Sequence, residues 1–287
     1  MIYDDHHVMA SSLNFEELEV NAKPAVLITG ASSGIGAVYA DRFAARGHEL
    51  VLVARDAARL DALAARLTAQ FGAPVEVLPA DLTDPTGLAR VEAHVREHPR
   101  LGVLVNNAGM AAGGGFVEQR RESHEQLIAL NVGALTRLAH AAAARFAAAG
   151  DGAIVNVGSV VGLAPELGMG VYGATKAFVL HLTQALDLEL GPKGVYLQAV
   201  LPAATRTEIW SRSGMDVSAI PGVMDPGELV DAALVGFDRR EAVTIPPLPD
   251  ERQWAAFEAA RKAMLPNYRQ AHPAARYRHE ALEPAQT

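Results

Sequence analysis

The chain has 287 residues, half of them hydrophobic, with a formal net charge of −8 at pH 7 and no cysteine. The hydrophobic share is enough to bury a sizeable core, and the negative charge argues against a nucleic acid or an anionic membrane as partner. The lack of cysteine excludes disulfides and thiol catalysis. Because no run approaches the roughly 20 apolar residues of a membrane span, we expect a soluble, cytoplasmic protein.

Short apolar runs alternate with longer stretches of helical spacing along the chain. Such runs, joined by helices, predict an α/β fold with a Rossmann-type doubly wound parallel sheet of about seven strands in a single domain. Glu122–Ala148 and Asp56–Gln70 have the spacing of helices. The expected strands are Ala25–Thr29, Leu50–Ala54, Val75–Leu78, Val103–Val105, Ala153–Val157, Val195–Leu201 and Ala242–Ile245.

The ends of the chain differ from its middle. Residues 1–22 are polar, with acids and histidines where a signal peptide would be apolar, and we expect an N-terminal appendage. Residues 23–265 should form the dinucleotide-binding catalytic domain, and residues 266–287 a C-terminal tail. Within the domain, residues 203–226 lack clear periodicity, which indicates a substrate loop.

A glycine-rich turn follows the first expected strand and opens a helix, in Thr29-Gly30-Ala31-Ser32-Ser33-Gly34-Ile35-Gly36. Gly30 can take the positive φ of a tight turn. Gly34 lets the backbone come close to a ligand, and Gly36 lets the helix and the strand pack closely. Free N–H groups at the start of the helix favour a pyrophosphate. A turn that merely joins strand to helix is the alternative, but its place in the pattern predicts a cofactor site formed by Gly30, Ser32, Ser33, Gly34, Ile35 and Gly36.

Arg55 follows the second expected strand, where an NAD site usually carries an acid for the ribose 2′-hydroxyl. A guanidinium there suits a 2′-phosphate, so we expect NADP(H) rather than NAD(H). Asp56 complicates this interpretation, but it can be the N-cap of the helix that follows. A solvated loop charge is the alternative for Arg55.

Three residues in the second half of the chain indicate proton transfer. Tyr172 and Lys176 are four residues apart, about one helical turn, so they share a helix face. Ser159 ends an apolar run 13 residues upstream of Tyr172. Tyrosine has an unperturbed pKa of about 10, and we expect the Lys176 ammonium to lower the pKa of Tyr172. With the glycine turn, these residues predict a nucleotide-dependent hydride-transfer enzyme.

Taken together, these motifs resemble the short-chain dehydrogenase/reductase family, in its larger NADP-preferring group. The resemblance covers about Pro24 to Ile245 and implies an oxidoreductase acting on a carbonyl or alcohol. It rests on Thr29–Gly36, Asp81, Asn106-Asn107-Ala108-Gly109, Asn131, Ser159, Tyr172, Lys176 and Pro202–Thr207.

The resemblance also implies roles for single residues. Asn131, Ser159, Tyr172 and Lys176 would be catalytic, with Asn131 holding a water that links Lys176 to solvent. Asp81 and the Leu82 amide would bind adenine, Asn107 would lie beside the cofactor, and Thr207 would hold the nicotinamide carboxamide. Tyr172 and Lys176 would also contact the cofactor. The alternatives are a turn or cap for Asp81, structural hydrogen bonding for Asn107 and a helix distortion for Asn131.

Some features leave alternatives open. The family commonly has Pro-Gly where this chain has Pro202-Ala203, which puts the substrate range in doubt. A non-catalytic redox sensor is the second functional hypothesis, although such sensors usually lack the Tyr or the Lys. His94 and His98 could bind a metal, but without a third ligand we expect none. The resemblance suggests a homodimer or homotetramer packed through Glu122–Ala148 and Thr175–Leu190, although these helices would also fit a monomer core.

Overall fold

The computed structural model describes residues 23–214, 216–217 and 220–278. The chain divides into two compact units, Met1–Pro247 and Leu248–Thr287. The expected appendage of residues 1–22 and the last part of the expected tail, residues 279–287, lie outside the described residues. The expected domain boundary at residue 265 stays a prediction beside the division that is observed after Pro247.

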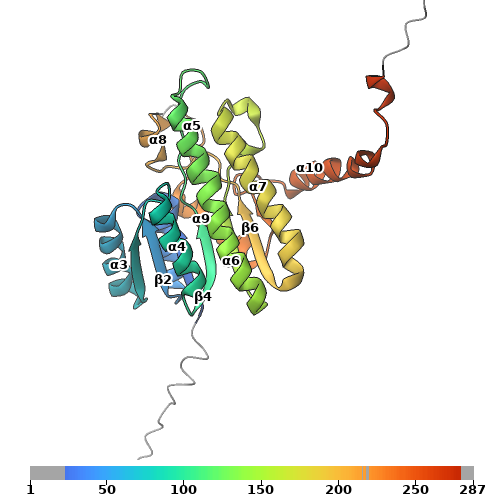
Figure 1. Cartoon of the computed structure of the whole chain (residues 1–287). Coiled ribbons are helices and arrows are strands. Elements are labelled where there is room, and N and C mark those ends of the chain that lie inside the picture. The colour runs from blue at the N-terminus through green and yellow to red at the C-terminus, as the bar shows by residue number, and fades with distance from the viewer. Residues whose placement is uncertain (1–22, 215, 218–219, 279–287) are drawn as a thin grey trace, which may run out of the picture. The chain divides into compact units, whose positions relative to one another are not determined.

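The first unit is built on a seven-stranded sheet with the order β3-β2-β1-β4-β5-β6-β7. Every neighbouring pair of strands is parallel, which confirms the expected doubly wound fold (Figure 1). Each predicted apolar run contains or overlaps one strand. The strands are β1 Ala25–Thr29, β2 Leu50–Ala54, β3 Val75–Pro79, β4 Leu101–Asn106, β5 Gly152–Val157, β6 Val195–Val200 and β7 Val243–Thr244.

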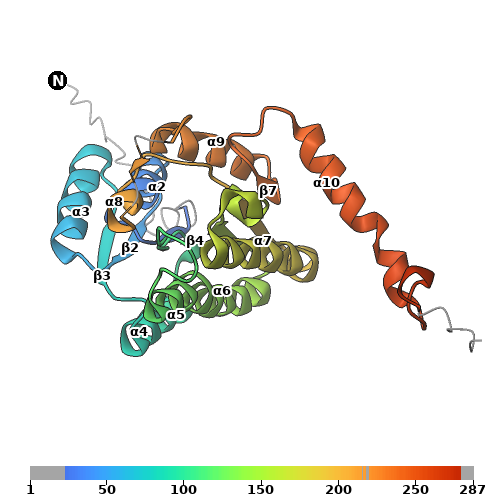
Figure 2. The ribbon, with the colours of Figure 1, turned by 90° about the horizontal axis from the view of Figure 1, so that it is seen from above.

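Helices cover both faces of this sheet, as Figure 2 shows from above. One face carries α2 (Gly34–Ala45), α3 (Ala57–Phe71) and α9 (Pro226–Asp238), and the other carries α4 (Pro85–Glu97), α6 (Leu135–Ala149) and α7 (Gly170–Leu190). Alternate residues of a strand point to opposite faces. Val26 of β1 therefore packs in the core under the first group of helices, while Leu27 packs under the second.

Local capping explains where several helices begin and end. The Asp56 carboxylate accepts a hydrogen bond from Arg59 N at 3.1 Å, which confirms Asp56 as the N-cap of α3. The N-cap of α4 is Asp84, whose carboxylate accepts from Gly87 N at 2.7 Å. At the end of α3, Gly72 takes a left-handed conformation with φ of 67°, which suits glycine because it has no Cβ.

The single helix expected over Glu122–Ala148 is interrupted. It consists of α5 (Arg121–Ile128), a π-helical turn at Ala129–Ala134 and then α6. Contrary to the expectation that no run approaches a membrane span, Arg121–Ala149 has a mean hydropathy of 1.3 in its most apolar window and would suit a span by length and composition. Half of that window is buried inside the fold, as in a helix that covers a sheet.

The second unit contains α10 (Glu251–Ala263), followed by short 3₁₀ turns at Leu265–Arg269 and Ala275–Tyr277. Asp250 is the N-cap of α10, and its carboxylate accepts from Arg252 N at 3.0 Å. The rings of Trp254 and Phe257 stack with centroids 5.3 Å apart. The two residues are three positions apart and therefore share one face of α10.

Candidate active site

The candidate residues meet at the carboxyl ends of the central strands. The chain reverses its direction of winding between β1 and β4, which are neighbours in the sheet. Ligands of doubly wound sheets bind outside the strand ends at such a switch point. The glycine turn leaves β1, Asn107 follows β4, and Ser159 follows β5. The topology thus brings together segments that are far apart in the sequence.

The glycine turn has the conformation that its sequence predicts. Gly30 and Gly34 have positive φ angles of 67° and 56°. A Cβ added to Gly36 would lie 2.3 Å from the Gly30 carbonyl oxygen, so this position accepts only glycine without movement of the backbone. Ser33, the N-cap of α2, makes no capping hydrogen bond through its side chain. The N–H groups at the start of α2 are therefore available for an anion.

Arg55 and Asp81 lie together beyond the ends of β2 and β3. The Arg55 side chain is 69% exposed, and its Nη1 is 3.9 Å from Asp81 Oδ2. Asp81 Oδ1 accepts hydrogen bonds from Thr83 N at 2.8 Å and from Thr83 Oγ1 at 2.7 Å. These bonds to Thr83 help to hold the pKa of Asp81 below its usual value, against the opposing effect of burial. Asp81 Oδ1 thus makes the turn contact that was the alternative for this residue. The binding of adenine by Asp81 stays a prediction.

Asn107 ties the glycine turn to the end of β4. Its side-chain amide donates to Thr29 O at 2.9 Å and to Gly30 O at 3.3 Å. This is the structural hydrogen bonding that was the alternative for Asn107, and its place beside the cofactor stays a prediction. The preceding Asn106 donates to Asn156 Oδ1 at 3.0 Å within the core and so joins β4 to β5.

Thr207 lies against the glycine turn from the other side. A Cβ added to Gly34 would lie 3.0 Å from Thr207 Cγ2. The side chain therefore sits where β1 opens into α2, close to the expected phosphates. The position agrees with a cofactor contact, and the assignment to the nicotinamide carboxamide stays a prediction.

Ser159, Tyr172 and Lys176 come together as expected from their spacing. Ser159 is the last residue before a 3₁₀ turn, and its hydroxyl donates to Pro202 O at 3.3 Å. Lys176 is 6% exposed, and its Nζ donates to Val157 O at 2.9 Å. The same ammonium lies 5.7 Å from the centroid of the Tyr172 ring. The phenol and the amine thus share one face of α7, beside the end of β5.

The pKa of Tyr172 moves in the opposite direction to the one expected. Burial raises it to about 12, and a hydrogen bond with Ser159 partly offsets this effect. Burial also lowers the pKa of Lys176 to about 8. The expectation was wrong for the protein by itself because desolvation of the phenolate is the largest effect on this pKa. The Lys176 Nζ donates instead to Val157 O.

The buried amine predicts how stability depends on pH. Lys176 has a pKa of about 8 when folded and 10.5 as a free side chain. Between these values the unfolded chain binds a proton that the folded chain does not, so stability rises with pH in this window. Relative to Lys176→Met, we expect the free energy of unfolding of the wild type to rise by about 3 kcal/mol from pH 8 to pH 10.5. Urea unfolding of both proteins would measure this, and a constant difference would contradict the burial of a titrating amine.

Asn131 lies in the π-helical turn and is 1% exposed. Its Oδ1 accepts from Met110 N at 3.0 Å, and its Nδ2 donates to Met110 O at 3.0 Å and to Thr175 Oγ1 at 3.1 Å. The side chain therefore joins the segment after β4 to α7. π-Helical turns occur often at functional sites. The expected water-holding role of Asn131 stays a prediction.

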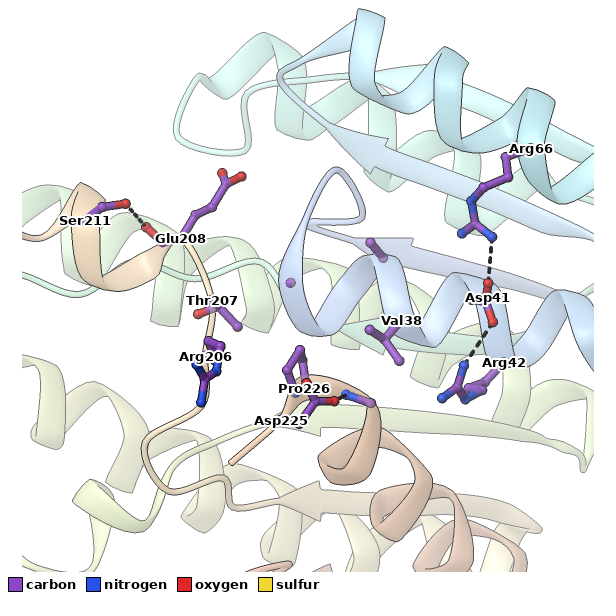
Figure 3. Close-up of a pocket in the computed structure, with 13 residues that line it drawn as sticks. Val38, Asp41, Arg42, Arg66, Arg206, Thr207, Glu208, Ser211, Asp225 and Pro226 are labelled. Atoms are coloured by element: carbon purple, nitrogen blue, oxygen red, sulfur yellow. Dashed lines mark hydrogen bonds and ion pairs between the residues drawn. The ribbon is translucent and has the colours of Figure 1, made fainter. Parts of the chain in front are cut away.

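An opening of about 680 Å³ lies beside the glycine turn, between the start of α2, the start of α9 and the segment from Arg206 to Ser211 (Figure 3). Gly34 and Thr207 contribute to its wall, whereas Ser159, Tyr172 and Lys176 do not. The opening is therefore next to the expected phosphate site rather than over the catalytic residues.

Glu208 was not singled out by the sequence, although it links residues 203–226 to α3. Its carboxylate accepts two hydrogen bonds from Arg59 Nη1, each of 2.8 Å. It also pairs with Arg212 in α8 (Ile209–Arg212). No periodicity connects positions 59 and 208, so the pair could be found only from the fold.

Ala203, which stands where the family commonly has the glycine of Pro-Gly, fits without backbone strain. Among the described non-glycine residues, a positive φ occurs only at Arg240. Ala203 therefore occupies its place after β6 in an ordinary conformation. Its carbonyl accepts a hydrogen bond from Thr205 Oγ1 at 3.0 Å, and the consequence for the substrate range stays open to experiment.

The His94 and His98 pair has an acidic neighbour, because one ligand atom each from Glu76, His94 and His98 lies within 4.8 Å of the others. His94 Nε2 has no hydrogen-bond partner among the described residues. Both ring nitrogens of His98 are occupied, since Arg100 N donates to Nδ1 at 3.3 Å and Nε2 is 3.5 Å from Glu49 Oε1. Glu76, whose Oε2 lies 3.4 Å from His94 Nε2, supplies the third ligand that was not expected, and the absence of a metal stays a prediction.

The fold agrees with what known proteins show. The family model for short chain dehydrogenase matches residues 24–217. The chain therefore belongs to the short-chain dehydrogenase family. This confirms the family, the Rossmann-type fold and the class of enzyme, an oxidoreductase that acts on alcohols and carbonyls.

Particular relatives are similar over most of the chain. A short-chain dehydrogenase from Sphingobium yanoikuyae, solved in complex with NADPH, has 65% identity and a TM-score of 0.88, and the match covers 89% of this chain and all of that one. The bulky-bulky ketone specific alcohol dehydrogenase from Comamonas testosteroni has 57% identity, a TM-score of 0.84 and coverage of 90% and 99%. A sulfoacetaldehyde reductase from Chromohalobacter salexigens is 34% identical over 81% of this chain and 96% of its own length.

Proposed function

We propose that this protein transfers a hydride between NADP(H) and a carbonyl or alcohol carbon, with proton transfer at Tyr172. The observation that carries the proposal is the convergence of Ser159, Tyr172 and the buried Lys176 at the end of β5. A Cβ added to Gly109 would lie 3.5 Å from Lys176 Nζ, and one added to Gly30 would lie 2.9 Å from the neighbouring Ala108 Cα. One short segment thus connects the proton-transfer group to the glycine turn.

Each side chain has a defined task in this reaction. When bound, NADPH supplies the hydride that adds to the carbonyl carbon. Ser159 donates a hydrogen bond to the carbonyl oxygen and aligns it with Tyr172. The Tyr172 hydroxyl gives its proton to this oxygen as negative charge develops there, which completes the alcohol. Lys176 remains cationic near neutral pH, because its pKa is about 8, and it stabilises the resulting phenolate.

The cofactor is NADP(H), and the free N–H groups at the start of α2 hold its pyrophosphate. Arg55 pairs with the 2′-phosphate, which its exposed guanidinium can reach from the end of β2. Asp81 Oδ2 and the Leu82 amide bind the adenine, and Thr207 and Lys176 hold the nicotinamide end. Support comes from the NADPH complex of the Sphingobium relative and from the position of Arg55 where NAD sites carry an acid.

The substrates are ketones with a large group on each side of the carbonyl, and the corresponding alcohols. The Comamonas relative is named for this class of ketone. Leu163 after β5 and Ile209 and Trp210 of α8 after β6 are partly buried apolar residues. They supply the apolar walls that such groups need. No observation favours the alternative of a non-catalytic sensor.

A cofactor-dependent assay tests this function. NADPH absorbance should fall when the protein receives a diaryl ketone, and kcat/KM with NADPH should exceed that with NADH. Arg55→Ala should lower this preference by about tenfold, because an ionised hydrogen bond to phosphate is lost. Arg46→Ala is the control, since Arg46 pairs with Asp238 at the far end of α2. Equal use of NADH by the wild type would refute the cofactor assignment, and no turnover of any ketone or alcohol would refute the reaction.

We further propose a cytoplasmic homodimer or homotetramer. An apolar hollow of about 410 Å³ lies over α5, the π-helical turn and α7 and includes Phe116, Ile128 and Val171. Phe116 is 68% exposed and Ile128 is 50% exposed, so a second copy would cover apolar surface there. Light scattering of the purified protein would measure the number of subunits.

A further inference from the structure

We infer that Thr175 is a positioning residue for the reaction proposed above, on which this inference rests. Its hydroxyl connects the turn of α7 that carries Tyr172 and Lys176 to the π-helical turn that carries Asn131. Nothing in the sequence motifs singles out this residue, which lies between the members of the Tyr-x-x-x-Lys pair. The proposal depends on its hydrogen bonds and on where they lead.

The Thr175 hydroxyl acts as acceptor and donor at once. It accepts from Asn131 Nδ2 at 3.1 Å and donates to Tyr172 O at 2.7 Å. Thr175 is 3% exposed and Asn131 is 1% exposed. In such a dry setting an unpaired polar group is costly. The first bond joins α7 to the π-helical turn, and the second connects the same hydroxyl to the backbone of Tyr172.

These bonds continue to the segment that borders the expected nicotinamide site. The Asn131 side chain exchanges hydrogen bonds with the backbone of Met110. A Cβ added to Gly109 would meet Asn131 Oδ1 at 3.4 Å and Lys176 Nζ at 3.5 Å. One continuous chain of contacts thus runs from Tyr172 O through Thr175 and Asn131 to the backbone that Lys176 also faces. Loss of the hydroxyl would let Tyr172 and Lys176 move relative to that backbone.

The same helix contains a matched control. Thr183 is fully buried, accepts from Asn156 Nδ2 at 3.0 Å and donates to Val179 O at 2.7 Å. Asn156 belongs to β5 and bonds to Asn106 of β4, so this second network lies within the sheet core. Valine at 175 or at 183 removes the same hydroxyl from the same kind of bond pair. A purely structural role would give both variants the same phenotype.

The experiment compares Thr175→Val, Thr175→Ser and Thr183→Val with the wild type, using NADPH and a diaryl ketone and then NADP⁺ and the alcohol. We expect Thr175→Val to lose about tenfold or more in kcat, because small misplacements of reacting groups are costly, with little change in KM for the cofactor. Alcohol oxidation needs the phenolate, so its rise with pH should move to higher pH as Lys176 loses its alignment with Tyr172.

The remaining variants decide between positioning and stability. Thr175→Ser keeps the hydroxyl and should retain most of kcat, while Thr183→Val should lower Tm like Thr175→Val and leave kcat and the pH profile unchanged. Wild-type kcat and pH profile in Thr175→Val would overturn the inference, and so would an equal loss of kcat in Thr183→Val. A wild type without turnover would overturn the proposed function and this inference together. An active wild type with an equally active Thr175→Val would overturn this inference alone.

Discussion

Replacing Tyr172 by phenylalanine is expected to lower kcat by about 10²–10⁴-fold, the usual contribution of a positioned general acid or base. The ring and its place on α7 remain, while the proton donor is removed. Binding of NADPH should be retained, because the glycine turn and Arg55 are untouched. Steady-state rates and fluorescence titration with NADPH would measure the two effects separately.

Tyr39 provides the control for this change. It is 1% exposed, and its hydroxyl has no hydrogen-bond partner among the described residues. Tyr39→Phe therefore removes the same atom from another buried tyrosine without breaking a described contact, and should leave kcat unchanged. Turnover by Tyr172→Phe at the rate of Tyr39→Phe would exclude Tyr172 as the proton donor.

Replacing Gly36 by alanine should damage both the cofactor site and the fold. The added Cβ would lie 2.3 Å from Gly30 O and 2.5 Å from Asn107 Nδ2, so the turn must move. We expect the free energy of unfolding to fall by about 1–3 kcal/mol, as for other overpacked sites. NADPH binding should weaken by at least about tenfold, or about 1.4 kcal/mol, because the displaced atoms belong to the turn that holds the phosphates.

Gly191→Ala is the matched substitution outside the site. Gly191 has a helical φ of −54°, and its added Cβ would meet Asp187 Oδ1 at an ordinary 3.7 Å. Both stability and NADPH affinity should stay close to those of the wild type. Calorimetry of the three proteins would test this, and a Gly36→Ala protein with wild-type affinity would show that the turn does not hold the cofactor.

Much of the fold could be predicted because its signals are local. The residues of β1 and β2 are continuous apolar runs with polar or glycine-rich ends, so their bounds match the expected ones. The Asp56 cap and the positive φ of Gly30 follow from residue type alone.

Other features depend on contacts between distant segments and could not be predicted in this way. A helix distortion was one alternative for Asn131, but the bonds that its side chain makes to Met110 and Thr175 from the π-helical turn join distant segments and have no signal in the sequence. The direction in which the pKa of Tyr172 shifts depends on how deeply its side chain is buried. The Tyr-x-x-x-Lys spacing does not predict this burial. The Arg59–Glu208 pair joins positions that only the fold makes neighbours.

The central claim is that this protein passes a hydride from NADPH to a carbonyl carbon while Tyr172 supplies the proton. Reduction of a diaryl ketone with NADPH that is fully deuterated at C4 of the nicotinamide, followed by mass spectrometry of the alcohol, tests it most directly. We predict one deuterium on the carbinol carbon for each NADP⁺ formed, and almost none in the same time with Tyr172→Phe. An alcohol without deuterium, or equal labelling by the variant, would contradict the account.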